Sequence, residues 1–211
     1  MPVLHPNQVA EYTSQGFTLA RQLLPVEWTA NCLQEVRSFF EDQASKLKRN
    51  LSGSLPIGAL IHEVMKKGGE ERNFVYRFVR HIRSLRVIET SPALFEALKD
   101  LGFRQPISLE FPSLRFDVQG EEQFLTKPHQ DVRSIRTGRC VTIWFPLVPV
   151  DQTRGSIAVY PGSHRHGLIE HKIDEKHTIV GGDYFLKPIV LKLDKMNLGL
   201  INKLLFEKGF T

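Results

Sequence analysis

The triplet His129-Gln130-Asp131 holds the side chains of this chain that are best suited to metal chemistry. Side chains alternate along an extended strand, so His129 and Asp131 share one face and Gln130 points away from it. An imidazole and a carboxylate side by side are two of the three ligands of the two-His-one-carboxylate site that holds non-haem Fe(II). The triplet also occurs on ordinary strands and turns, so its surroundings decide what it means.

Two motifs follow the triplet at short range. The first is Trp144-Phe145-Pro146-Leu147, and the second runs from Gly155 to His164 and ends in Pro-Gly-Ser-His. This succession resembles the phytanoyl-CoA dioxygenase family, whose pattern is close to His-Gln-Asp, Trp-x-Pro-Leu and Gly-x-Leu-x-Val-x-Pro-Gly-Ser-His. Residues 8–17 are similar to the opening helix and strand of the family, so the resemblance extends over most of the chain.

The resemblance implies an Fe(II)- and 2-oxoglutarate-dependent dioxygenase that hydroxylates a small organic substrate with O2. His129 and Asp131 would be metal ligands, and no catalytic side chain is expected beyond the ligands. The substrate and the oligomeric state are not indicated, because substrate contacts in such folds lie on loops that follow no readable code. The Gly-rich residues 50–69 are the segment expected to form a lid.

The third metal ligand departs from the family pattern. The position that corresponds to the distal His is Glu207, and the sequence ends at Thr211 before the Arg that would grip 2-oxoglutarate. Glu207 could serve as an oxygen ligand, which would make the site more anionic, or His177 could supply the third ligand. Alternatively, the site is incomplete because the chain is truncated or diverged. The protein would then be a non-catalytic jelly-roll relative that acts as a binding or regulatory module.

The 2-oxoglutarate pocket is expected around the strand after the triplet. Cys140, Thr142 and Trp144 share one face of this strand by the period-two rule. If that face lines the pocket, Thr142 could donate a hydrogen bond to 2-oxoglutarate and Trp144 could wall the site. Arg115 could bind the 2-oxoglutarate carboxylate in place of the missing Arg. The Pro161-to-His164 segment predicts a tight turn with a mainly structural role.

The remaining elements favour helices first and strands afterwards. Helices are expected at residues 7–14, 25–48, 59–67 and 92–100, with a short strand at 16–19, whereas residues 74–80 fit either a helix or a strand. Short strands are expected at residues 107–111, 113–118, 124–131, 139–146, 155–160, 177–180, 189–193 and 198–206.

This pattern predicts a mainly-β fold with flanking helices: a cupin-like double-stranded β-helix, or jelly roll, in a single domain of residues 1–211. Residues 1–105 would be a mostly helical buttress. Residues 106–211 would be the jelly-roll core, ending before its last strand.

Composition limits the other possibilities. The formal net charge of +5 is spread along the chain, which argues against a nucleic-acid interface but fits an anionic small-molecule substrate drawn to a basic rim. No apolar run reaches the length of a membrane span, and no signal peptide is evident at the start. Two widely spaced cysteines, Cys32 and Cys140, fit a reducing, cytoplasmic location rather than a disulfide framework.

Overall fold

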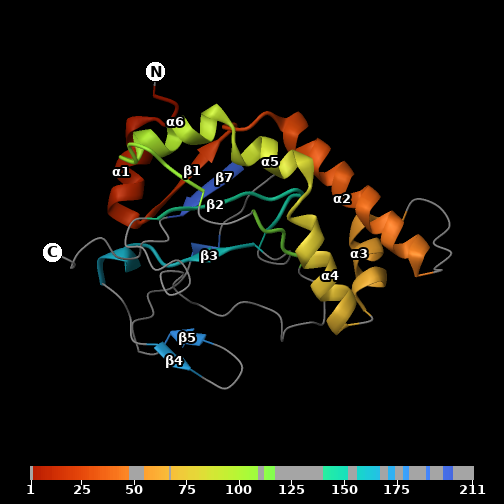
Figure 1. Cartoon of the computed structure of the whole chain (residues 1–211). Coiled ribbons are helices and arrows are strands. Elements are labelled where there is room, and N and C mark those ends of the chain that lie inside the picture. The colour runs from red at the N-terminus through yellow and green to blue at the C-terminus, as the bar shows by residue number, and fades with distance from the viewer. Residues whose placement is uncertain are drawn as a thin grey trace.

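A computed structural model describes ten stretches of the 211-residue chain (Figure 1). They are residues 2–47, 55–66, 68–108, 112–116, 140–151, 156–166, 171–173, 178–180, 189–190 and 197–201. A layer of helices from the N-terminal half lies against short strands, most of which come from the C-terminal half (Figure 1). No helix in these stretches combines the length and the apolar character needed to cross a bilayer.

Helices dominate the first hundred residues. They are α1 (Pro6–Gln15), α2 (Val26–Lys46), α3 (Ile57–Met65), α4 (Gly69–Val79), α5 (Arg83–Glu89) and α6 (Pro92–Asp100). The expected helices at α1, α2, α3 and α6 are confirmed to within two residues at each end. The undecided residues 74–80 are mostly helical as part of α4, and α5 was not predicted.

The ends of these helices follow local rules. Ser91 caps α6 by accepting from the Leu94 N–H at 3.3 Å, and Pro92 occupies the first turn, where a missing N–H costs nothing. His5 is the N-cap of α1 and forms a reciprocal capping box with Gln8. Asp100, at the end of α6, accepts from the N–H groups of Val3 and Leu4 at 2.8 and 2.9 Å, which ties the N-terminal segment to α6.

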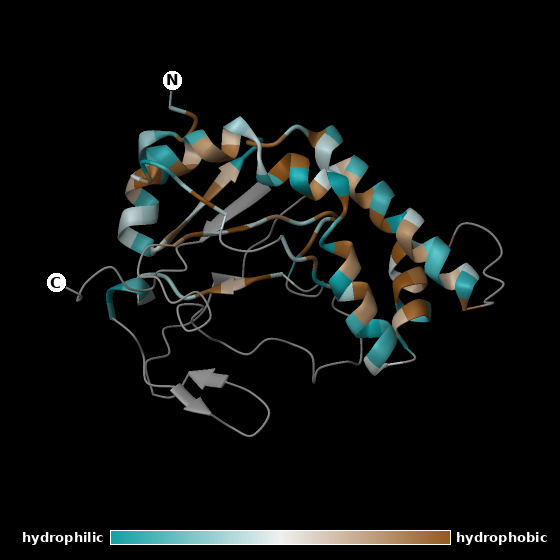
Figure 2. Ribbon diagram, viewed as in Figure 1, coloured by the Kyte–Doolittle hydropathy of each residue, from teal (hydrophilic) through white to brown (hydrophobic). Residues whose placement is uncertain are grey.

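The core is built on one face of α2. Its buried residues recur every three or four positions, as an amphipathic helix requires: Thr29, Cys32, Val36, Phe40 and Ala44. Hydrophilic and hydrophobic residues accordingly alternate along this helix in Figure 2. Burial, with a smaller contribution from the nearby Glu35 charge, raises the pKa of Cys32 to about 12. Cys32 is therefore a packed, unreactive thiol rather than a nucleophile.

Glu35 connects α2 to the start of α5. Its two carboxylate oxygens accept from the backbone N–H of Ser84 at 3.0 Å and from the Ser84 hydroxyl at 2.9 Å. Ser84 is 8% exposed, so water cannot easily replace these bonds. We expect Glu35→Ala to lower the free energy of unfolding by about 1–3 kcal/mol, because it leaves two buried donors of Ser84 without an acceptor. Urea denaturation followed by circular dichroism measures this loss.

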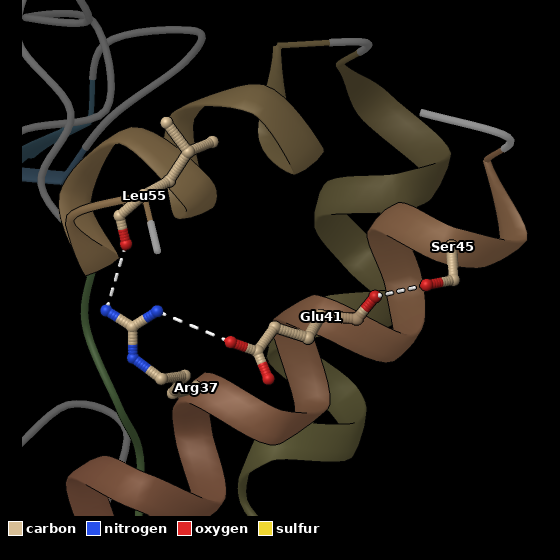
Figure 3. A network of polar contacts seen from close by, with 4 residues as sticks. All are labelled: Arg37, Glu41, Ser45 and Leu55. Atoms are coloured by element: carbon tan, nitrogen blue, oxygen red, sulfur yellow. Dashed lines mark hydrogen bonds and ion pairs between the residues drawn. The ribbon is translucent and has the colours of Figure 1, made fainter. Parts of the chain in front are cut away.

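Glu41→Ala is the matched control, further along the same helix. Glu41 pairs with Arg37 at 3.3 Å on the exposed side of α2, and Arg37 also donates to the Leu55 carbonyl at 3.0 Å (Figure 3). Exposed pairs of this kind contribute about 0–1 kcal/mol. An equal loss of stability in Glu35→Ala and Glu41→Ala would contradict the burial argument.

The strands are short and form three small antiparallel sheets. The strands are β1 (Phe17–Arg21), β2 (Thr142–Trp144), β3 (Ala158–Val159), β4 (His171–Ile173), β5 (Thr178–Val180), β6 (Ile189–Val190) and β7 (Asn197–Ile201). The largest sheet has the order β1-β7-β2, and the others pair β3 with β6 and β4 with β5. In the large sheet, Phe17 and Thr142 both lie opposite Ile201. The first and last described strands are therefore hydrogen-bonded neighbours.

The expected mainly-β jelly roll is wrong. In the described part of the chain, helices of up to 21 residues dominate, no strand exceeds five residues and the largest sheet has three strands. Residues 107–108 and 113–116, where strands were expected, form none. The physical reason is visible at Leu114 and Phe116, whose alternating apolar side chains pack on the helical core instead of pairing in a sheet.

Candidate functional site

Strand β2 separates two environments. Ile143 packs against the helical core, whereas Trp144 packs on the opposite side, against a second cluster built around Phe17 and Val159. The period-two alternation predicted from the sequence is thus confirmed at this strand. Thr142 lies two residues before Trp144 and shares its face. One side of the sheet faces away from the helices, and we call this side the inner face.

The inner face is mainly apolar. Phe17 and Leu19 of β1, Trp144 of β2 and Val159 of β3 belong to its cluster, together with Val150 and Ile157. β3 runs beneath β2 in Figure 1, so the cluster fills the space between the two strands. Trp144 is half-buried there and forms part of an apolar wall, whereas its role beside 2-oxoglutarate stays a prediction. Such a wall excludes water and strengthens any polar contact made beside it.

The hydroxyl of Thr142 is the unusual polar group of this face. Its Oγ1 is buried and has no hydrogen-bond partner in the described part of the chain. A buried hydroxyl without a partner costs about 1–3 kcal/mol, and most such groups in native proteins are satisfied. The hydroxyl is therefore available to a ligand that brings its own acceptor. This is the observation that fits 2-oxoglutarate, whose carboxylates are strong acceptors.

Arg115 lies on a different segment. Its neighbours Leu114 and Phe116 pack against the helical core, with the Phe116 ring 5.1 Å from that of Phe40. Arg115 is exposed between them, so its side chain points away from that core. Its role as a carboxylate partner stays a prediction. Cys140, which precedes Thr142 by two residues, is buried.

The predicted metal ligands fall outside the described residues. His129, Asp131 and Glu207, and the alternative ligand His177, all lie there. Within the described stretches, no three His, Cys, Asp or Glu side chains gather closely enough to hold a metal ion. The assignment of the ligands consequently depends on their chemistry: neutral imidazole and carboxylate donors suit Fe(II).

The Pro-Gly-Ser-His segment forms the predicted tight turn. Gly162 adopts a left-handed conformation with φ of 74°, and the chain continues as the 3-10 helix η2 (Ser163–His166). The Ser163 hydroxyl and N–H both donate to the Tyr160 carbonyl, at 2.6 and 3.1 Å. These bonds fix the turn internally, which agrees with a structural role.

Gly16 and His164 meet at this turn. The His164 ring lies against Gly16, which ends α1 with φ of 80°. Gly16 had a local signal, because glycine just past a helical pattern is typical of a left-handed C-terminal cap. His164 ends the predicted Pro-Gly-Ser-His turn, but its contact with Thr13 of α1, 151 residues away, had no local signal.

Comparison with known protein families identifies a match over most of the chain. The family model described as phytanoyl-CoA dioxygenase matches residues 12–181, a span that includes the His129-Gln130-Asp131 triplet, β2 and the tight turn. No curated protein matches the chain.

Proposed function

The chain belongs to the phytanoyl-CoA dioxygenase family, and from that membership we propose that it is an Fe(II)- and 2-oxoglutarate-dependent dioxygenase acting on a small organic substrate. The observation that supports this most directly is the position of the Thr142 hydroxyl, which has no partner among the described residues, on the apolar inner face and on the strand that follows the triplet. When bound, iron and 2-oxoglutarate supply the oxidation: decarboxylation of 2-oxoglutarate to succinate, coupled to hydroxylation of the substrate by O2.

The side chains of this protein would then hold and orient these groups. His129 would offer an unprotonated ring nitrogen, and Asp131 a carboxylate oxygen. Thr142 would donate its hydroxyl hydrogen to a carboxylate oxygen of 2-oxoglutarate, and Trp144 would keep water from that side of the pocket. Glu207 is our first choice for the third ligand and His177 the second. An acidic third ligand would weaken binding of dianionic 2-oxoglutarate, which the Arg115 charge would offset.

We also place the protein in the cytosol. The sequence has two cysteines, Cys32 and Cys140, which are far apart and do not make a disulfide framework. This usage is typical of a reducing compartment, where Fe(II) also persists.

Thr142→Val tests the pocket. Valine has nearly the same shape but no hydroxyl, so the variant removes a buried unpartnered group and leaves the packing similar. We expect the ligand-free variant to be as stable as the parent or more stable, by up to about 3 kcal/mol. Its affinity for 2-oxoglutarate in the presence of Fe(II) should fall about tenfold, the effect of one hydrogen bond to a charged acceptor.

Thr142→Ser, which keeps the hydroxyl, is the control and should bind 2-oxoglutarate like the parent. Thermal denaturation gives the stability, and anaerobic calorimetry gives the affinity. A large loss of stability in Thr142→Val, with unchanged 2-oxoglutarate affinity, would mean that the hydroxyl serves the fold instead of the cofactor.

A further inference from the structure

We propose that His164 is a positioning residue that latches the turn after β3 onto the C-terminal end of α1 and thereby holds the inner face closed around Thr142 and Trp144. The proposal builds on the proposed function, because it assigns a role toward the same pocket. It concerns a different part of the chain from the expected metal ligands and is supported by its own contacts.

Three contacts join the turn to α1. The His164 Nε2 atom lies 3.0 Å from the Thr13 carbonyl oxygen, and the Gly162 N–H donates to the Gln15 carbonyl at 2.8 Å. The last carbonyls of a helix have no partner within the helix, so the turn satisfies two of them in α1. The third contact is steric: a Cβ atom added to Gly16 would stand 2.5 Å from His164 Nδ1. The ring is therefore packed directly on the backbone of Gly16.

These contacts determine the protonation state of the ring. A carbonyl only accepts, so Nε2 must carry the hydrogen, and Nδ1 is then the unprotonated nitrogen. Nδ1 is buried and has no hydrogen-bond partner in the described part of the chain. Adding a proton at Nδ1 would place a charged donor against Gly16 with nothing to accept it. The latch is thus built for neutral histidine.

The latch is adjacent to the inner face through the chain itself. Gly16 is followed directly by Phe17, and residues 158–159 of β3 lie just before the turn. Phe17 and Val159 are the two buried members of the inner-face cluster on which Trp144 packs. Holding the turn to α1 therefore fixes β1 and β3 at one end of that cluster. A loosened latch would let the wall beside Thr142 open.

The latch should weaken in acid. Desolvation lowers the pKa of His164 from its ordinary 6.5; the positive charges of Arg165 and His166 lower it further, and the bond to Thr13 opposes them. Those two side chains lie on η2 itself, whereas α1 contributes the Thr13 carbonyl and the Gly16 backbone. Above pH 6.5, His164 is neutral in both the folded and the unfolded chain. When the pH is lowered below 6.5, the unfolded chain binds a proton before the folded chain does. The free energy of unfolding therefore decreases as the pH is lowered, until the lower pKa of the folded chain is reached.

The test compares His164→Ala, His164→Gln and His166→Gln in the full chain. Glutamine can still donate to the Thr13 carbonyl but does not titrate, and His166 is an exposed histidine on the same 3-10 helix. Hydrogen exchange of the Gly162 amide reports the latch without any cofactor. Anaerobic calorimetry with Fe(II) and 2-oxoglutarate reports the pocket. Both are measured at pH 7.5 and pH 6.

We expect His164→Ala to speed Gly162 exchange about tenfold at pH 7.5, the effect of one lost hydrogen bond, and to weaken 2-oxoglutarate binding. His164→Gln should match the parent at pH 7.5 and keep its Gly162 protection factor at pH 6, where the protection factors of the parent and of His166→Gln should fall. Protection factors are compared because the intrinsic rate of amide exchange itself falls as the pH is lowered. Should His164→Ala fail to fold, the pH dependence of His164→Gln decides the question alone.

Unchanged Gly162 exchange in His164→Ala, or the same response in His166→Gln, would overturn the latch. Faster exchange with unchanged 2-oxoglutarate affinity would overturn its positioning role. If the parent itself binds neither iron nor 2-oxoglutarate, the proposed function fails and the positioning role fails with it, while Gly162 exchange still decides whether His164 latches the turn.

Discussion

Replacing His129 with alanine is expected to lower the affinity for Fe(II) by at least about 100-fold. The proposed site has three protein ligands, and loss of even a supporting partner in a metal site typically costs 10–100-fold, so loss of a ligand should cost at least as much. The imidazole is also the nitrogen donor that distinguishes the site from a surface pair of carboxylates. Anaerobic competition with a colorimetric Fe(II) chelator measures the change.

Gln130→Ala is the matched control for this variant. Gln130 is the neighbour of both ligands and is expected to point to the other face of the strand, so its loss should leave the Fe(II) affinity unchanged. Glu207→Ala and His177→Ala extend the series to the third ligand, and the variant with the larger loss identifies it. Tight Fe(II) binding retained by His129→Ala would overturn the ligand assignment.

Phe40→Ala is expected to have the largest effect on folding. Phe40 is 0% exposed, and its ring meets Phe39 at 5.5 Å and Phe116 at 5.1 Å, both edge to face. Truncating a fully buried phenylalanine removes apolar contact and leaves a cavity, at a cost of about 3–5 kcal/mol. The Phe116 contact adds a local consequence, because residues 112–116 lose their main aromatic anchor on α2. Urea denaturation measures the global loss.

Phe78→Ala is the control for Phe40→Ala. Phe78 also belongs to the aromatic chain of the helical layer, with its ring 4.3 Å from Phe74, but 46% of it is exposed. Its truncation leaves no closed cavity, so we expect a loss of about 1 kcal/mol or less. Similar losses in the two variants would contradict the assignment of the core to the buried face of α2.

Local sequence signals predicted the elements that local physics determines. The helices expected at residues 25–48 and 92–100 each depend on neighbours a few residues apart, and both are confirmed as α2 and α6. The predicted fold class was wrong because it depends on contacts between distant parts of the chain. Apolar alternation at Leu114 and Phe116 looks the same whether the partner is a strand or a helix, and the sequence alone does not show which surface covers it.

Some features of the candidate site could likewise be predicted from the sequence, whereas others depend on tertiary packing. The triplet and the family pattern could be recognised from residue types, and the shared face of Thr142 and Trp144 followed from strand alternation. That the Thr142 hydroxyl has no partner among the described residues depends on the final packing, so no sequence pattern reports it. The contact between His164 and Thr13 joins residues 151 positions apart, and it arises only when the turn after β3 is brought against α1.

Anaerobic addition of Fe(II) and then 2-oxoglutarate to the parent chain tests the proposed function most directly. We predict that iron binds, and that 2-oxoglutarate then produces the weak visible charge-transfer band of an Fe(II) centre that has bound it. The band should diminish in Thr142→Val and disappear in His129→Ala. A parent chain that binds neither iron nor 2-oxoglutarate would contradict the proposal, and would point instead to a family member that acts by binding rather than by catalysis.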